Sequence, residues 1–235
     1  MKILLAIAIF FLLTGCETTQ QVLNSMNTGT PALSATEIAS GLKEALRIGT
    51  QNSTGRLAAA DGFFSNAAIK ILMPEEAKKV ESTLRSIGLG SLVDKAVLSM
   101  NRAAEDAARS ATPIFVDAIR TMTITDALGI LKGGDYAATN YFKDKTTLSL
   151  TNAFRPVIEK ALAKVDATKY WNDAFTAYNK FAAKPVNTDL AGYVTERSLA
   201  GIFYEVGQEE QKIRKDPAAR VTELLKKVFN GNNQQ

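Results

Sequence analysis

The chain has 235 residues, enough for one large or two small domains, and 46% of them are hydrophobic, which argues against intrinsic disorder. The formal net charge of +4 is weak and the charges are interspersed, so we expect no nucleic-acid partner. The chain contains no histidine, which excludes Ser-His-Asp triads, Cys-His pairs and HExxH zinc sites.

Residues 1–15 have the pattern of a secretory signal peptide, with Lys2 first and an apolar run from Ile3 to Leu13. The run is too short for a transmembrane helix, which needs about 20 apolar residues. The segment Leu13-Thr14-Gly15-Cys16 resembles the lipobox of bacterial lipoproteins. This resemblance implies cleavage between Gly15 and Cys16 and acylation of Cys16, whose acyl chains would hold the protein on a membrane.

An acylated Cys16 predicts a location in the cell envelope. The next residue is Glu17, not the aspartate that signals inner-membrane retention in enterobacterial lipoproteins, and this favours the outer membrane, facing the periplasm. Residues 16–33 are polar and small and predict a flexible tether, and residues 230–235 predict a disordered polar tail.

Between these ends, apolar residues recur at helical spacing and almost nowhere alternate as in a strand. The pattern predicts helices over residues 34 to about 60, 74–88, 89–110, 114–122 and 126–132. It then predicts a separate helical turn over 136–142, helices over 147–165, with a kink at Pro156, and over 168–181 and 189–213, and a last helix after Asp216-Pro217.

Residues 69–73 are ambiguous, because their apolar run fits a strand but no partner strand is evident, so we expect helix or buried extended chain. The sequence therefore predicts an all-α fold for residues 34–229, a single irregular bundle of about eight to ten helices without a significant sheet.

Several short segments also suggest a family. They are Ser40-Gly41-Leu42-Lys43-Glu44-Ala45-Leu46, Asp61-Gly62-Phe63-Phe64, Met100-Asn101-Arg102-Ala103-Ala104-Glu105, Asp126-Ala127-Leu128-Gly129-Ile130-Leu131, Ala137-Ala138-Thr139-Asn140-Tyr141-Phe142, Gly201-Ile202-Phe203 and Glu209-Glu210-Gln211-Lys212-Ile213-Arg214-Lys215-Asp216-Pro217. As an ordered set, they resemble the DUF4197 family of bacterial envelope proteins, many of them lipoproteins. The resemblance supports the predicted fold and location, but this family's function is unknown and it implies no mechanism.

Two of these segments contain candidate polar residues for a binding or structural cluster. Arg102 and Glu105 project away from the apolar stripe of the predicted 89–110 helix. We expect a solvated face on which Arg102 pairs with Asp106, one turn further on. The alternative is that Arg102 and Glu105 face a second helix layer or a pocket.

Asp126, Glu210 and Arg214 complete this set of candidates. Glu210 lies close to an apolar stripe, where a carboxylate needs a partner. We expect Arg214 or Arg220 to pair with it at the Asp216-Pro217 corner, and a ligand contact is the alternative. The aromatic residues from Tyr170 to Phe181, together with Tyr136, Tyr141 and Phe142, are expected to be core, or else to line an apolar cavity.

We expect no enzyme, no catalytic residue, no metal and no cofactor, because phosphate-binding loops and catalytic motifs are missing from the sequence. The leading hypothesis is a lipid-anchored binding domain whose partner is an envelope protein or a small apolar ligand. A lipid carrier requires an enclosed apolar cavity above about 300 Å³. An assembly protein requires an exposed apolar patch of several hundred Å². A hydrolase requires carboxylates that converge in a cleft with raised pKa values.

Overall fold

A computed structural model describes residues 33–164, 168–169, 171–172, 176, 179–180, 185, 187–220 and 222–229. The predicted signal peptide, Cys16, the tether up to residue 32 and the tail lie outside the described residues. The same holds for most of the predicted 168–181 helix.

The described residues form eight α-helices and two short 3₁₀ helices, and they contain no strand. In chain order these are α2 (Ala35–Leu57), η1 (Glu75–Ala77), α3 (Lys78–Ser86), α4 (Gly90–Ala108), α5 (Ala111–Thr121), α6 (Ile124–Lys132), α7 (Ala137–Ala163), α9 (Leu190–Lys215), η2 (Pro217–Ala219) and α10 (Glu223–Phe229). The predicted all-α fold is confirmed.

One prediction about helix boundaries is wrong. The separate turn over 136–142 and the helix over 147–165 form one continuous helix, α7, which also runs through Pro156. The polar residues between the two apolar segments stay helical, and the hydroxyls of Thr146 and Thr147 donate hydrogen bonds to the carbonyls of Phe142 and Lys143, four residues earlier.

The ambiguous residues 69–73 are neither helix nor strand. Ile69 and Ile71 are buried, and the main chain of Ile71 is held by the side chain of Asn101 on α4. The Ile71 N–H donates to Asn101 Oδ1 at 2.9 Å, and Asn101 Nδ2 donates to the Ile71 carbonyl at 2.8 Å. A side-chain amide therefore supplies the two hydrogen bonds that a partner strand would have made.

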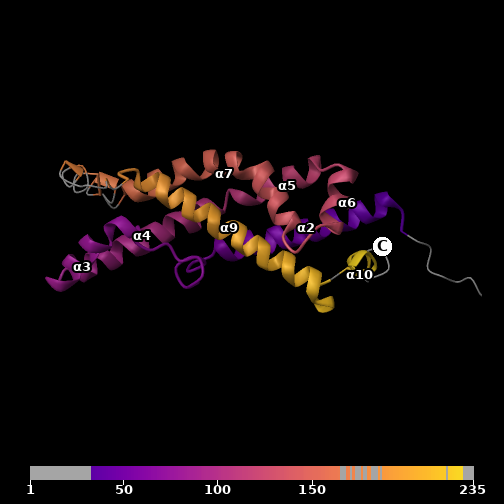
Figure 1. Ribbon diagram of the computed structural model, residues 1–235, viewed down its shortest axis with the longest axis horizontal. Coiled ribbons are helices and arrows are strands. Elements are labelled where there is room, and N and C mark those ends of the chain that lie inside the picture. Colours follow the sequence, from indigo (N-terminus) through magenta and orange to yellow (C-terminus); the bar gives the residue numbers. More distant parts are fainter. Residues whose placement is uncertain are drawn as a thin grey trace, which may run out of the picture. The chain divides into compact units, whose positions relative to one another are not determined.

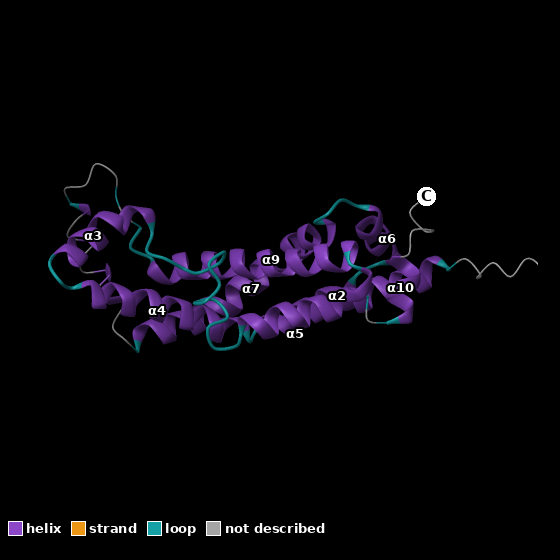
Figure 2. Cartoon of the chain, turned by 90° about the horizontal axis from the view of Figure 1, so that it is seen from below, coloured by secondary structure: helices purple, strands orange, loops and turns teal. Residues whose placement is uncertain are grey.

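Helices α9, α7 and α2 organise the bundle. Helix α9 packs along α7 and along α2, α7 also packs on α4 and α5, and α2 also packs on α5, α6 and α10 (Figures 1 and 2). Three phenylalanine rings join α5, α7 and α9. The Phe115 and Phe142 centroids are 5.2 Å apart and those of Phe115 and Phe203 are 6.3 Å apart, both edge to face.

A glycine on α9 receives the ring of Phe63 from the loop after α2. Phe63 is fully buried, and a Cβ added at Gly201 would lie 2.6 Å from Phe63 Cε1. Because the packed ring has no space to move into, only glycine is accommodated at this position without rearrangement. The contact places the turn containing Phe63 directly on α9.

We therefore expect Gly201→Ala to lower the free energy of unfolding by about 1–3 kcal/mol through overpacking. The matched control is Gly129→Ala in α6, where an added Cβ meets nothing within 4 Å. This change should raise stability by up to about 1 kcal/mol, because alanine favours helix. Urea unfolding followed by circular dichroism measures both. Equal midpoints for Gly201→Ala and the wild type would contradict the tight contact.

Candidate functional site

Buried carboxylates gather on α9, which carries Glu205, Glu209 and Glu210, each no more than 9% exposed. Glu209 and Glu210 come seven residues after Ile202 and Phe203, so they lie on the apolar stripe of the helix. A buried carboxylate without hydrogen bonds is strongly unfavourable. Each of the three glutamates is accordingly engaged by another segment of the chain.

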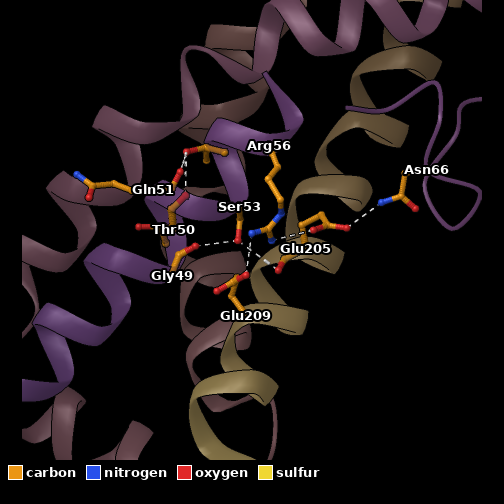
Figure 3. A network of polar contacts seen from close by, with 9 residues as sticks. Gly49, Thr50, Gln51, Ser53, Arg56, Asn66, Glu205 and Glu209 are labelled. Atoms are coloured by element: carbon orange, nitrogen blue, oxygen red, sulfur yellow. Dashed lines mark hydrogen bonds and ion pairs between the residues drawn. The ribbon is translucent and has the colours of Figure 1, made fainter. Parts of the chain in front are cut away.

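Arg56, in the last turn of α2, bridges two of these glutamates (Figure 3). Its Nη2 lies 3.1 Å from Glu205 Oε2 and its Nη1 lies 2.8 Å from Glu209 Oε1. Asn66 Nδ2 donates to Glu205 Oε1 at 2.9 Å, and Ser53 Oγ donates to the Glu205 carbonyl at 3.2 Å. This network joins α2, α9 and the loop that follows α2.

The surroundings of Arg56 in this network favour its charged form. Burial acts against it, but the hydrogen bonds to Glu205 and Glu209 outweigh burial and raise the pKa of Arg56. Arg56, Glu205 and Glu209 are not among the candidates predicted from the sequence, although Glu209 follows Ile202 at a spacing that indicates a buried carboxylate.

Glu105 on α4 holds the turn formed by Asp61-Gly62-Phe63-Phe64. Its Oε1 accepts the main-chain N–H groups of Phe63 and Phe64 at 3.1 and 3.2 Å, and Glu105 is only 3% exposed. Arg102 pairs with Glu105 at 2.6 Å and with Asp61, which has a positive φ of 66°, at 2.7 Å. A carboxylate that binds two successive N–H groups fixes the conformation of the turn.

The expected solvated face at this point of α4 is therefore wrong for Glu105, and so is the expected pair between Arg102 and Asp106. The loop after α2 covers the face that the helical pattern assigns to solvent, and it supplies Asp61 as a partner for Arg102. Asp106 instead lies 3.7 Å from Arg109.

Glu210 and Arg214 join the end of α6 to the start of α7. Glu210 accepts the main-chain N–H groups of Ala138 and Thr139, each at 2.9 Å, and these are free donors in the first turn of α7. Arg214 lies 2.9 Å from Glu210 and donates to the Ile130 carbonyl in α6 at 2.8 Å. The pair thus neutralises the ends of two helices with charges of the favourable sign.

The expected approach of Arg220 to Glu210 is wrong. Arg220 donates instead to the carbonyls of Ile213 and Arg214 at the end of α9, at 3.2 and 2.9 Å. The Asp216-Pro217 corner forms as the sequence predicts, because the Asp216 side chain accepts the Ala218 N–H and Pro217 begins η2.

Asp126 is separate from the other candidates. It lies in the first turn of α6, where it and Thr123 form a reciprocal capping box with two 3.0 Å hydrogen bonds. The main-chain N–H of Thr123 lowers the pKa of Asp126. The five candidate residues therefore occupy three separate places, at the turn after α2, at the start of α6 and at the α6–α7 junction.

The aromatic candidates are divided between core and surface. Phe142 is fully buried, whereas Tyr136 is 48% exposed, so these two do not share one cavity wall. Trp171 is buried and its Nε1 donates to the Asn187 carbonyl at 3.2 Å. The remaining aromatics between Tyr170 and Phe181 lie outside the described residues.

Two surface hollows were compared with the requirements of a carrier and of a hydrolase. A hollow of about 340 Å³ between α5 and α7 is lined by Pro113, Ile114, Asp117, Ala118, Thr121, Lys145, Thr146 and Ser149. A hollow of about 260 Å³ on α3 is lined by Glu76, Lys79, Val80, Thr83 and Leu84. Both are open and have charged residues in their walls, unlike the enclosed apolar cavity that a carrier requires. Neither contains any of the buried glutamates.

The carboxyl groups also differ from those of a hydrolase. Hydrogen bonds from Arg47, Arg155 and Lys226 respectively lower the pKa values of Glu44, Asp189 and Glu223, which is the direction opposite to the one a hydrolase requires. Among the same residues no group of three Asp, Glu or Cys side chains is placed to hold a metal ion. The buried charges here are used to hold the fold.

A family model described as "Protein of unknown function (DUF4197)" matches residues 32–230. This range includes Arg56, Glu105, Glu210 and the residues that they contact. The chain belongs to the DUF4197 family. No curated protein and no solved structure matches it. In this DUF4197 protein, none of the described helices is long and apolar enough to cross a membrane.

Removing Glu210 tests its role in the DUF4197 fold. We expect Glu210→Ala to lower the free energy of unfolding by about 3–5 kcal/mol, because Arg214 is then left largely buried without its counter-charge. Amide hydrogen exchange at Ala138 and Thr139 should accelerate. The control Glu223→Ala removes an exposed carboxylate paired with Lys226 and should leave stability unchanged. Similar losses in the two variants would contradict a special role for Glu210.

Asp189 provides a pH-dependent test. Hydrogen bonds from Arg155 and from the Gly192 N–H lower its pKa, so it stabilises the fold above its ordinary pKa, and this contribution is lost as the pH falls through its lowered value. Asp189→Ala removes the N-cap of α9, which should cost about 1 kcal/mol near neutral pH. The difference from wild type should vanish in acid.

The matched control for Asp189 is Asp117→Ala, which removes the exposed partner of Arg120. Urea unfolding curves between neutral pH and pH 3 measure both variants. A difference between Asp189→Ala and wild type that stays constant over this range would contradict the assignment.

Proposed function

We propose that this DUF4197 protein is a lipid-anchored, non-enzymatic binding protein of the bacterial cell envelope. In this proposal an acylated Cys16 holds the protein on a membrane. Because residue 17 is Glu and not the aspartate of inner-membrane retention, we favour the outer membrane, on its periplasmic side. The helical domain then acts by contacting another molecule through an exposed surface.

The observation that carries the binding role is an apolar surface at the α3–α4 hairpin. Helix α3 contains no buried residue, and next to it the side chains of Ile87, Leu89 and Leu92 are 63%, 41% and 52% exposed. We call these three residues the hairpin patch. Adjacent exposed apolar side chains of this size are typical of interaction sites.

Leu89 is the first residue of the helix predicted over residues 89–110, and it is exposed. Helix α4 begins only at Gly90, so Leu89 precedes its first turn, where neighbouring helices no longer cover the stripe. Further along the helix, Val93, Val97, Met100, Ala104 and Ala107 are buried, and Ala96 is half-buried. The apolar side chains thus change from exposed to buried along the chain. This supports a role of the exposed ones, at the hairpin end, in contact with another molecule.

The use of the buried charges also supports a non-enzymatic role. The carboxylates of Glu105, Glu205 and Glu210 accept hydrogen bonds from the protein itself and lie outside both open hollows. General acid–base catalysis needs a group within hydrogen-bonding reach of a substrate.

The anchor is tested by metabolic labelling with an alkyne fatty acid in cells that produce the full chain. Wild type should carry the label and sediment with membranes, and Cys16→Ser should lose the label. Wild type without label would contradict the proposed anchor. Because acyl transfer is read from the label alone, the result does not depend on what the hairpin patch binds.

A further inference from the structure

We propose that the hairpin patch binds a second copy of this chain, so that the protein self-associates through its α3–α4 hairpins. The inference rests on the proposed function, because it takes the exposed apolar surface as a binding surface. It goes further by naming the occupant. Three observations on shape, charge and position support a second copy over another partner.

The first observation is that one hairpin carries both a protruding apolar side chain and a hollow. Ile87 lies four residues after Thr83 and three after Leu84, a spacing that places it on the same side of the helical hairpin, and these two residues line the hollow of about 260 Å³ on α3. A two-fold axis places the same surface on both sides of an interface, so each copy would offer its Ile87 to the hollow of the other.

The amount of apolar surface fits a modest interface. The three side chains of the hairpin patch expose on the order of 300 Å² in one copy, which is the size of the largest patch on many monomers. The patches of two copies would together bury about 600 Å² of apolar surface, and specific complexes bury at least about 1,200 Å² in total, so the polar borders must supply the rest. Two copies anchored in one membrane surface would also meet at a raised effective concentration, which favours such an interface.

The second observation is the balance of charge around the patch. Residues 74–95 contain four acidic side chains (Glu75, Glu76, Glu81 and Asp94) and four basic ones (Lys78, Lys79, Arg85 and Lys95), so the net charge is zero. Attraction to anionic lipid headgroups needs an excess of basic residues. A balanced surface instead suits a second copy, because two-fold symmetry brings equal numbers of both signs to the border from each side.

Some of these charges already pair within one hairpin, as Lys78 with Glu75 and Arg85 with Asp94. Among the described residues, no ion pair involves Glu76, Lys79 or Lys95. Glu76 and Lys79 border the hollow and have opposite charges. They are available to meet opposite charges of another hairpin without breaking existing ion pairs.

The third observation is the position of the hairpin. Helix α3 and the start of α4 lie at one end of the helical unit, and the first turn of α2 lies at the other, in both views (Figures 1 and 2). The first described residues of the chain therefore lie at the end of this unit away from the hairpin patch.

The test uses the anchored full chain, with photoreactive p-benzoylphenylalanine in place of Ile87. Two copies with different tags are produced in the same cells, and ultraviolet light should give an adduct that carries both tags. The matched control places the same residue at Leu148 on α7, which is 74% exposed. We expect at least tenfold more doubly tagged adduct at position 87, and its loss when Leu92→Asp is added.

Other outcomes overturn the proposal in distinguishable ways. An adduct of one copy with a different protein, or with a phospholipid, rules out self-association and leaves the hairpin patch as a binding surface. No more adduct at position 87 than at position 148 removes both self-association and the binding role of the hairpin patch. Ile87 and Leu148 are both exposed, so neither replacement should disturb folding, and the helical circular dichroism signal checks this.

Discussion

Buried carboxylates that capture main-chain N–H groups or an arginine hold this fold together. Glu105 fixes the turn at Phe63 and Phe64, and Glu210 caps the first turn of α7. Each anion replaces hydrogen bonds to water with hydrogen bonds to donors that would otherwise be unsatisfied. Removing one partner therefore lowers the free energy of unfolding by much more than the intact pair raises it. This asymmetry makes these contacts specify the arrangement of the helices.

The hairpin end of the bundle is built differently. Around α9 the carboxylates and the rings of Phe63 and Phe203 lie in densely packed surroundings, whereas α3 has no buried residue. Local stability follows the burial of apolar side chains, so α3 has less internal packing to lose than α9. An exposed apolar surface on such a region becomes buried only through contact with another molecule. The proposed self-association would give the hairpin patch that contact.

Expectations drawn from helical spacing held where neighbouring helices cover the helix as the pattern assumes, and they were wrong where a loop or a helix end intervened. On α4, Val93, Val97 and Met100 are buried, but Leu89 is exposed because it precedes the helix. Glu105 lies on the face assigned to solvent, yet the loop after α2 covers it. A helical wheel contains no information about a loop that arrives from a distant part of the chain. The segments predicted separately over 136–142 and 147–165 are one helix, α7, whose continuity the apolar spacing of either segment does not show.

The sequence by itself determined the all-α class, most helix positions and the corner at Asp216-Pro217, because local spacing and capping act within a few residues. It also marked Glu210 as a buried carboxylate that needs a partner. Only the tertiary structure decided that the partners of Glu210 include the start of α7, and that Arg56 bridges two glutamates of α9. These contacts join residues 71 to 153 positions apart, and their geometry depends on how whole helices pack.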